Sequence, residues 1–406
     1  MRINIYSLAA RAAFVSIFSL AGCAGEAEQQ LQQQSQQQPT WEEFRARAFQ
    51  DPDTGIFIVN GDEPALNEAR LREFYDRMIG QKASATEQEG VGQTQQPLTA
   101  LNLPGWANKW SIPAALNLTY CINSASFGGY YASVVSAMNT AAADWKATGA
   151  SLKFVHTSSL DSNCNNTTNV VFNVRMVTNM QPTLARAFFP GDPREAREIL
   201  IDVSSFGNIT PWTLAGILRH ELGHVLGFRH EHVRPEAAAG ACNETDSYWR
   251  AVTAYDSASV MHYPQCNGTN VGDLKLTPTD AVGVRSHYPV AILPEQGLVS
   301  GQSISSSDGR FLLYMQADGN LVHYWNGHGA LWSTVTGGSQ GKSAWMQGDG
   351  NFVLYTTTTP VVGSSLWSSI TYGNPGAYLA IQNDGNLVVY AKDGMTPLWN
   401  SNTGGH

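Results

Sequence analysis

The sequence predicts a multidomain chain in which an α+β domain is followed by an all-β prism with approximate threefold symmetry. The 406 residues exceed what one hydrophobic core usually holds. From Leu98 to about Val290, helical apolar periodicity alternates with short β-rich runs. The residues after 290 contain three copies of one short repeat, each a turn followed by an alternating strand.

The middle region supplies the elements of the α+β domain. We expect a helix from Tyr131 to Thr148, because its apolar residues recur at helical spacing. Two further helices should begin after the capping residues Thr213 and Thr277, the second with Pro278 in its first position. Four β-rich runs are expected to form strands, at residues 152–156, 169–177, 184–190 and 198–205.

Charge and composition exclude one class of partner. Charged residues make up 14% of the chain, below the roughly 25% that is typical of soluble proteins. The net charge is −9 and no basic tract interrupts the sequence, which argues against a nucleic-acid partner. The abundance of small polar residues favours a loop-rich, exported protein.

The first 22 residues have the pattern of a lipoprotein signal peptide. An apolar run from Ala12 to Leu20 follows basic residues and is too short to span a membrane. It ends in Leu-Ala-Gly-Cys, which resembles a bacterial lipobox and implies lipidation of Cys23. This implies an exported chain that is lipid-anchored to the bacterial cell envelope, at the outer membrane or released extracellularly. The alternative is an ordinary signal peptide in which Cys23 is incidental.

Further boundaries follow from composition. Residues 23–40 are Gln-rich and cannot bury apolar surface, so we expect a flexible tether. Residues 41–97 hold a compact block and a polar linker, which is the arrangement of a propeptide. A domain at 98–290 and a β domain at 291–406 complete the chain.

The five cysteines fit an exported protein. Without Cys23 an even number remains, which predicts two disulfides. Three pairings can be drawn, and the order along the chain suggests Cys121–Cys164 and Cys242–Cys266.

The stretch "HELGHVLGFRHEH" at residues 220–232 carries the chemistry. On a helix, His220 and His224 project from one face and can reach one metal ion. Gly227 allows the chain to turn back and deliver His230 as a third ligand. Three imidazoles with water in the fourth place suit Zn²⁺, which activates that water for hydrolysis of a peptide bond. Glu221 is then the general base and later the general acid.

This stretch, with "SVMHYP" at 259–264, resembles the metzincin peptidases and within them the astacin-like enzymes. It is also similar to the bacterial HEIGH-type metallopeptidases. The resemblance implies protein or peptide substrates, a Met turn at Met261, and a zinc-binding or oxyanion-stabilising role for Tyr263. It also implies that Glu231 contacts the mature amino terminus once a propeptide has left.

Two residues near this stretch have competing interpretations. Astacin propeptides place an Asp on the zinc, and Asp62 in "FIVNGDEP" matches that residue. The alternative for Asp62 is a helix cap before Pro64. His232 has no role in these families, and we expect it to face solvent.

The C-terminal repeats read "QADGNLVHY", "QGDGNFVLY" and "QNDGNLVVY", at spacings of 31 and 35 residues. Alternation should place five side chains of each repeat on one strand face. The pattern resembles the bulb-type mannose-binding lectins, which implies a threefold β-prism, mannose-type glycan partners and centrally packed Trp332, Trp367 and Trp399. The implied sugar-binding residues are Gln316, Asp318, Asn320, Val322 and Tyr324; Gln347, Asp349, Asn351, Val353 and Tyr355; and Gln382, Asp384, Asn386, Val388 and Tyr390.

Together these features predict an exported zinc endopeptidase, made as a zymogen and targeted to mannose-containing glycans by its C-terminal domain. The alternative is a surface-displayed, carbohydrate-binding adhesin on a degenerate peptidase scaffold. The intact Glu221 counts against this alternative.

Overall fold

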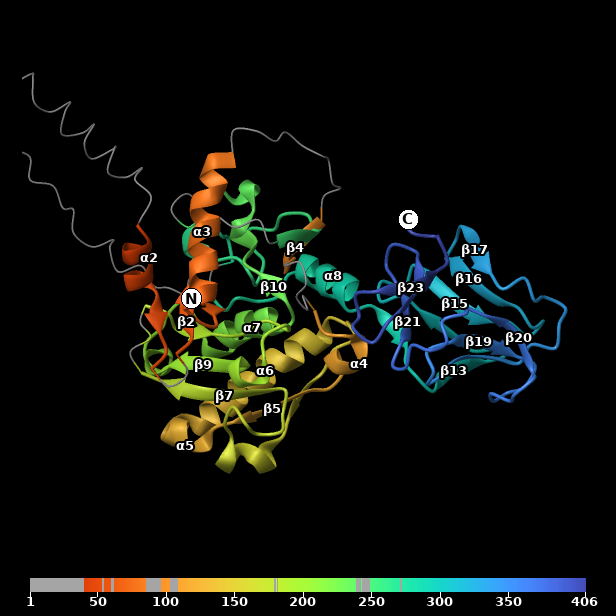
Figure 1. Cartoon of the computed structure of the whole chain (residues 1–406), viewed down its shortest axis with the longest axis horizontal. Helices are drawn as coiled ribbons and strands as arrows, with labels where there is room; N and C mark the ends of the chain where they lie inside the picture. The colour runs from red at the N-terminus through yellow and green to blue at the C-terminus, as the bar shows by residue number, and fades with distance from the viewer. Residues whose placement is uncertain are drawn as a thin grey trace, which may run out of the picture.

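The computed structural model describes residues 40–52, 55–59, 62–84, 96–102, 109–178, 180, 182–238, 242, 249–270 and 272–406. Figure 1 shows an N-terminal block and a mixed α/β part on one side, joined through α8 to a β-rich part on the other. The expected signal peptide, Cys23 and nearly all of the tether lie outside the described residues. Within those residues, no helix has the length and apolar character needed to cross a membrane.

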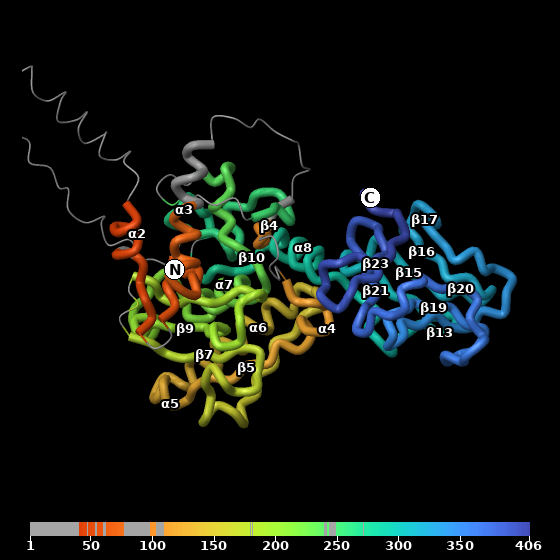
Figure 2. Tube along the Cα trace, in the orientation of Figure 1, coloured from red at the N-terminus to blue at the C-terminus, as the bar shows by residue number. Residues whose placement is uncertain are grey.

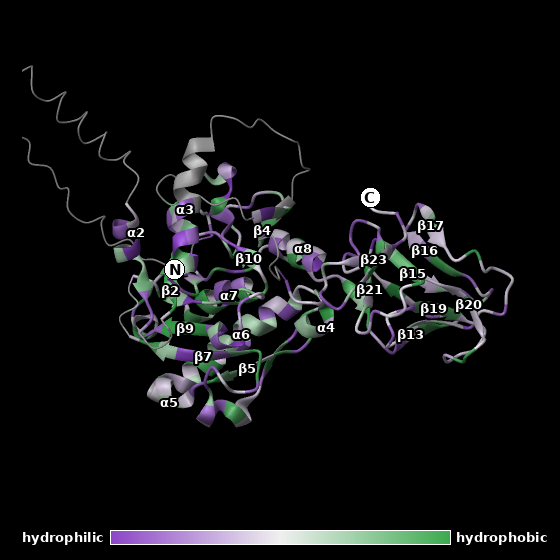
Figure 3. Ribbon diagram, in the orientation of Figure 1, coloured by the Kyte–Doolittle hydropathy of each residue, from purple (hydrophilic) through white to green (hydrophobic). Residues whose placement is uncertain are grey.

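A five-stranded sheet forms the base of the α/β part. Its order is β6 (Phe154–His156), β5 (Leu118–Ile122), β7 (Phe172–Val177), β9 (Glu198–Asp202) and β8 (Ala185–Arg186). The first four strands are parallel and β8 pairs antiparallel at the edge. All five residues of β9 are buried, and the strand is predominantly hydrophobic in Figure 3. The four β-rich runs therefore contain strands, as predicted.

Helices complete the core on this sheet. α6 (Tyr131–Ala147) and α7 (Leu214–Val225) pack on each other, and Trp145 Nε1–H donates to the carbonyl of Arg219 at 2.9 Å. The predicted cap Thr213 accepts a hydrogen bond from the amide of Gly216. Thr277 caps α8 (Pro278–His287) in the same way and forms a capping box with Asp280. Shorter helices are α4 (Ile112–Ala115) and α5 (Ser124–Phe127), and 3₁₀ turns lie at Gly128–Tyr130, Ser158–Asn163, Arg194–Ala196, Val203–Phe206, Glu231–Val233, Pro235–Ala237 and Pro264–Cys266.

A second, smaller sheet lies beside α7 and has the order β10 (Phe228–Arg229), β4 (Gln96–Leu101) and β11 (Trp249–Thr253). Gly227, between α7 and β10, has a φ of 92°, a value that favours glycine. The amide of Leu101 donates to the carbonyl of Gly227 at 2.9 Å. The chain therefore reverses as the sequence predicts.

The N-terminal block has its own elements. These are α2 (Trp41–Arg47), β1 (Phe49–Gln50), β2 (Phe57–Val59), β3 (Glu63–Ala65) and α3 (Glu68–Ser84). A separate apolar cluster around Phe57 and Leu71 holds them together. Asp62 precedes a strand, and α3 begins only at Glu68, where the side chain of Asn67 accepts from the amide of Arg70. The interpretation of Asp62 as a helix cap is therefore wrong.

Both disulfides form in the pairing that the chain order suggests. Cys121–Cys164 ties β5 to the loop before β7, and Cys242–Cys266 ties the segment after the histidine stretch to the residues after Met261.

The C-terminal part consists of three four-stranded antiparallel sheets that share one apolar core, and Figure 2 shows this part beside α8. Trp332, Trp367 and Trp399 meet there edge to face, with ring centroids 5.3–5.6 Å apart. The strands are β14 (Ser303–Ser305), β15 (Phe311–Met315), β16 (Leu321–Trp325) and β17 (Gly329–Ser333); β13 (Gln296–Val299), β18 (Ser343–Met346), β19 (Phe352–Tyr355) and β20 (Ser365–Ser368); and β12 (Val290–Ile292), β21 (Tyr378–Ile381), β22 (Leu387–Tyr390) and β23 (Pro397–Asn400).

One detail of the repeat prediction is wrong. Of the five side chains in each copy, only the Val and Tyr lie on a strand, for example Val322 and Tyr324 on β16. The Gln, Asp and Asn lie in the turn before it, because the glycine after Asp has a φ of 90–93° and reverses the chain. The five residues still meet, as described below.

Candidate metal centre and repeat sites

α7 presents His220 and His224 one turn apart, and both side chains are buried. Nδ1–H of His220 donates to the carbonyl of Val260 at 2.7 Å, and Nδ1–H of His224 donates to the carbonyl of Phe228 at 2.8 Å. These bonds fix the tautomer, so that each Nε2 carries a lone pair. Burial also lowers the pKa of His220 to about 4, which keeps it neutral. Neither Nε2 hydrogen-bonds to a residue in the described ranges.

The turn at Gly227 and the short strand β10 bring His230 to the same point. Its Nε2 lies 2.9 Å from Oδ1 of Asp62, while Nε2 of His220 and His224 lie 3.4 and 3.5 Å from the Asp62 carboxylate. The four donor atoms all lie within 4.8 Å of one another. Three imidazole nitrogens and one carboxylate oxygen in a buried cluster are a donor set that suits Zn²⁺. The residues therefore fit the predicted metal.

Glu221 lies beside this cluster and lacks the hydrogen-bond donors or cations that usually accompany a buried carboxylate. It is 0% exposed, and neither of its carboxylate oxygens has a hydrogen-bond partner in the part of the chain that the structure describes. Burial raises the pKa of Glu221 well above its usual value, and the charge of Asp62 raises it further. A carboxyl group in this state has a high affinity for a proton.

Met261 lies directly beneath α7 and explains the glycine inside that helix. Gly223 faces the Met261 sulfur, and a Cβ atom at this position would overlap it and would lie 3.3 Å from Trp145. The carbonyl of Met261 accepts from the amide of Glu231 at 2.9 Å, which links this turn to the segment after His230. Met261 therefore packs against the helix that carries His220 and His224.

Tyr263 also reaches the cluster. Its ring centroid lies 4.5 Å from that of His230 and 5.5 Å from that of His220, and its hydroxyl donates to Oδ2 of Asp62. The predicted ligand or oxyanion residue and the predicted propeptide residue therefore bind each other.

His232 contradicts the expectation of a solvent-facing side chain. It is 2% exposed and stacks on His230 and Tyr263, with centroids 4.8 Å away in each case. The reason is the 3₁₀ turn after His230, which folds the chain back under the cluster instead of leading it to the surface. Its ring supports those of His230 and Tyr263.

Glu231 is held by three groups. Thr99 on β4 donates to it at 2.7 Å, and the Arg234 guanidinium and the Asp256 amide each donate at 3.2 Å. Burial raises the pKa of Glu231 to about 8, which Arg234 partly opposes. This carboxyl group therefore ties the metal-binding segment to β4, close to the start of the expected peptidase domain.

No sequence pattern predicts the ion pairs between the N-terminal block and the peptidase part. Glu63 binds Arg229, and Asp51 binds Arg175 at 2.6 Å. Single acidic residues in a propeptide look ordinary, so only the structure reveals that these two are buried. The Arg immediately before the third histidine was the one available hint.

The three C-terminal copies share one arrangement of side chains. In each copy the Gln amide donates to the Tyr hydroxyl, at 2.7, 2.5 and 3.0 Å along the chain. The Asn Oδ1 accepts from a backbone amide, of Thr336, Thr371 or Thr403, so its NH₂ group remains for a ligand. The Asp side chain accepts from the backbone N–H of the Asn and so shapes the turn.

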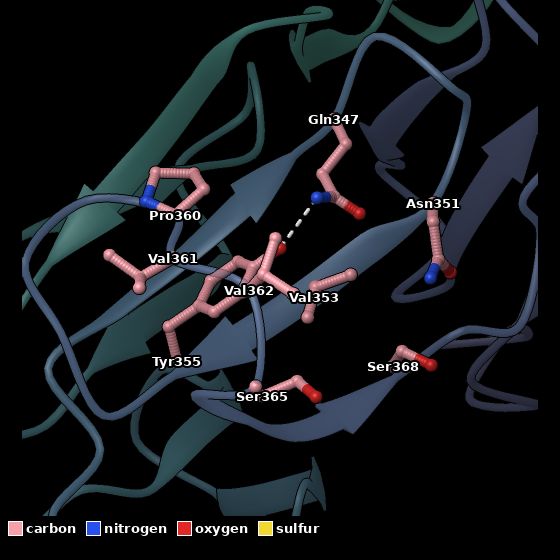
Figure 4. A pocket seen from close by; sticks show the side chains of 10 residues that line it. Gln347, Asn351, Val353, Tyr355, Pro360, Val361, Val362, Ser365 and Ser368 are labelled. Carbon is pink, nitrogen blue, oxygen red and sulfur yellow. Dashed lines mark hydrogen bonds between the residues drawn. The ribbon is translucent and has the colours of Figure 1, made fainter.

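The second copy lines a pocket of about 280 Å³. Gln347, Asn351, Val353 and Tyr355 form its floor in Figure 4, with the Gln347–Tyr355 hydrogen bond drawn across it. The turn after β19 is long, running from 356 to 364, and its Val361 and Val362 form a wall of the pocket. The corresponding turns in the first and third copies span only 326–328 and 391–396.

The third copy faces the peptidase part. Tyr378 and Ala380, which pair with Tyr390 and Val388 across the sheet, are buried in the same apolar cluster as the core of that part. Nζ of Lys109 lies 5.5 Å from the centre of the Tyr390 ring, and Gly394 packs against Ser111. The peptidase part therefore covers some of the strand face that carries Val388 and Tyr390.

A buried set of three imidazoles with an unpaired carboxyl group beside it defines a metallopeptidase-type site. Residues 109–261 match the family described as "Dual-action HEIGH metallo-peptidase". This match supports a zinc metallopeptidase domain, because the family implies zinc and the donor set fits that ion. No curated protein matches the chain.

Several solved lectin structures are similar to a part of the chain. A Japanese Marasmius oreades lectin is 32% identical, covers 29% of this chain and 92% of its own, and has a TM-score of 0.25. A monomeric mannose-binding lectin from Gastrodia elata is 32% identical, with coverage of 28% and 97% and a TM-score of 0.24. The mannose-specific agglutinin of snowdrop (Galanthus nivalis) bulbs, complexed with methyl-α-D-mannoside, is 32% identical, with coverage of 25% and 88% and a TM-score of 0.22.

Proposed function

We propose that the protein is an exported, metzincin-type and astacin-like zinc endopeptidase, made as a zymogen and directed to mannose-containing glycans by its C-terminal domain. The observation that carries the catalytic part is the convergence of three buried imidazoles next to Glu221, whose carboxylate binds no described residue. An adhesin on a degenerate scaffold would have no need for such a costly buried carboxyl group.

His220, His224 and His230 would hold the zinc ion, which when bound supplies a Lewis acid that polarises a peptide carbonyl and acidifies water. Glu221 accepts the proton of the attacking water and returns it to the leaving amine. The Tyr263 hydroxyl, once it is released from Asp62, donates to the oxyanion that forms at the scissile carbonyl. Met261 and His232 pack beneath the ligands and fix their orientation.

Asp62 supports the zymogen part of the proposal. Its carboxylate lies 2.9–3.5 Å from the three Nε2 atoms and also accepts from the Tyr263 hydroxyl, so it would keep water and substrate away from both. Removal of the N-terminal block would take this carboxylate away from the three imidazoles and from the Tyr263 hydroxyl in one step.

Sugar binding rests on the shared Gln, Asn and Tyr geometry of the three copies. Each copy leaves an Asn NH₂ group available beside a Gln–Tyr pair and an apolar Val, which are the donors and the apolar surface that a hexose requires. Because the third copy faces the peptidase part, we propose that the first two provide most of the binding.

We predict that Glu221→Gln keeps zinc but lowers casein hydrolysis by about 10²–10⁴-fold, because an amide cannot accept the proton of water. Zinc content by atomic absorption and casein hydrolysis of the activated chain test this. The exposed Glu195→Gln is the matched control and should leave both unchanged. Zinc-replete Glu221→Gln protein that digests casein at the original rate would contradict the mechanism.

We predict that Asp62→Ala makes the full, uncleaved chain hydrolyse casein at least about tenfold faster than the original, because the carboxylate no longer blocks the centre. Asp76→Asn on α3, an exposed position, is the control and should have no effect. Equal activity of uncleaved Asp62→Ala and unchanged protein would refute the inhibitory role of Asp62.

We predict that the full chain is retained on mannan, and that Asn320→Asp and Asn351→Asp each weaken retention and abolish it together. The change keeps the acceptor that each Asn uses internally, but replaces its free NH₂ donor by a charged oxygen. Asn386→Asp should have the smallest effect of the three. Retention that survives the Asn320/Asn351 double change would place sugar binding elsewhere.

We also propose that Cys23 carries the membrane anchor, on the basis of the Leu-Ala-Gly-Cys sequence after the apolar run. Cys23→Ser should then move the protein from the membrane fraction to the soluble fraction, whereas the change of an exposed residue, Glu195→Gln, should not. If both fractions are the same with and without Cys23, the chain is not anchored through this residue.

A further inference from the structure

The turn that follows β19 distinguishes the second copy of the repeat from the other two. It runs from 356 to 364, whereas the turns after β16 and β22 span only 326–328 and 391–396. Its residues Val361 and Val362 line the pocket whose floor carries the polar side chains of this copy. In the second copy, the predicted sugar site therefore continues into an apolar surface.

Hydrogen bonds within the turn and to its neighbours hold this surface in place. The amide of Thr356 donates to the carbonyl of Ser364 at 2.9 Å, which closes the base of the turn. The carbonyl of Val361 accepts from the amide and the hydroxyl of Ser364, at 3.2 and 2.8 Å. On the other side of the turn, the hydroxyl of Ser343 on β18 donates to the carbonyl of Thr357 at 2.6 Å. Because the turn is already ordered, a ligand would meet little entropic cost in binding to it.

The two valines of this turn are exposed, although they line a pocket. Val361 is 49% exposed and Val362 is fully exposed, whereas Val353 on the pocket floor is 3% exposed. A single exposed valine needs no explanation, but two adjacent ones at a preformed pocket with a few polar groups are typical of a ligand site. A ligand that covers them gains free energy only through an apolar group of its own.

The polar and apolar groups lie at different ends of the pocket. Pro360 and Val361 lie at the end opposite Asn351, as Figure 4 shows. A hexose whose hydroxyl groups bond to Asn351 can rest its C–H surface on Val353, so the sugar itself does not need the further valines. Its other end would face them. Hydroxyl groups gain nothing from such a surface, but an apolar group attached to the sugar does.

We propose that the second copy binds a mannose-type residue that carries an apolar substituent, an alkyl, acyl or aryl group, and that Val361 and Val362 contact this substituent. The first copy, which has a short turn, binds the unsubstituted sugar equally well with or without this group. This inference rests on the proposed function, because it requires the second copy to bind the sugar.

The first experiment varies only the ligand. The full chain with Asn320→Asp and Asn386→Asp keeps the second copy alone, and its affinities for methyl and hexyl α-D-mannoside are measured by calorimetry. We expect hexyl mannoside to bind at least about tenfold more tightly, because each methylene group that is removed from water contributes about two- to fourfold. Hexanol alone should not compete. Equal affinity for the two mannosides overturns the inference.

The second experiment assigns the preference to the long turn. In the same background, the double change Val361→Ser and Val362→Ser should remove the gain from the hexyl group and leave binding of methyl mannoside unchanged. Val335→Ser, which alters an exposed valine of the first copy, is the matched control and should keep the gain. A gain that is undiminished in the protein with both serines overturns the assignment.

A third comparison uses the first copy as an internal control. The chain with Asn351→Asp and Asn386→Asp keeps the first copy alone and should bind methyl and hexyl mannoside with equal affinity. An equal gain in this chain would mean that the hexyl group binds without the long turn, which contradicts the inference.

Further measurements identify the source of the apolar group and the alternative occupant. A butanoyl ester of methyl α-D-mannoside is compared with hexyl mannoside, and the ligand with the larger gain shows whether the group is an ester on the sugar or an aglycone. If sedimentation velocity shows a dimer that the two serines dissociate, the valines bind a second copy of the chain and the inference is wrong. Methyl mannoside binding without a hexyl gain removes this inference alone, whereas binding of no mannoside removes the proposed sugar function with it.

Discussion

The main constraint on this structure is that four buried donor atoms from two distant parts of the chain must meet within 4.8 Å. Two imidazoles come from one helix, the third requires the chain to reverse at Gly227, and the carboxylate comes from a separate block. Several neighbouring residues hold these donor atoms in place. Val260 and Phe228 carbonyls orient the rings, Gly223 makes room for Met261, and His232 supports the ring of His230.

The sequence predicted much of the fold because its signals are local. Thr213, Thr277 and Pro278 mark the starts of helices through their own chemistry, and the histidine spacing requires only the geometry of a helix and one glycine turn. The order of the cysteines gave the disulfides because each bridge closes a short loop. The repeats revealed a threefold fold because identical short segments must occupy equivalent places.

What the sequence could not predict depends on contacts between distant residues. His232 is buried because a 3₁₀ turn folds back under the ligands, which a motif does not encode. The pairs Glu63–Arg229 and Asp51–Arg175 join the N-terminal block to the peptidase part, with no pattern that relates one partner to the other. The sequence analysis expects all five residues of each repeat on one strand because it carries the two-residue alternation of a strand across the Asp-Gly turn. The positive φ of that glycine ends the alternation.

The connection between the two large parts of the chain is a strand and not a linker. β12 follows α8 almost immediately and pairs with β21, while Tyr378 and Ala380 beside it are buried among residues of the peptidase core. Pulling the C-terminal part away would therefore expose the apolar surface that Tyr378 and Ala380 share with the peptidase core. The repeats are therefore docked on the peptidase core through buried side chains, and the short step from α8 to β12 leaves little chain to let them swing away.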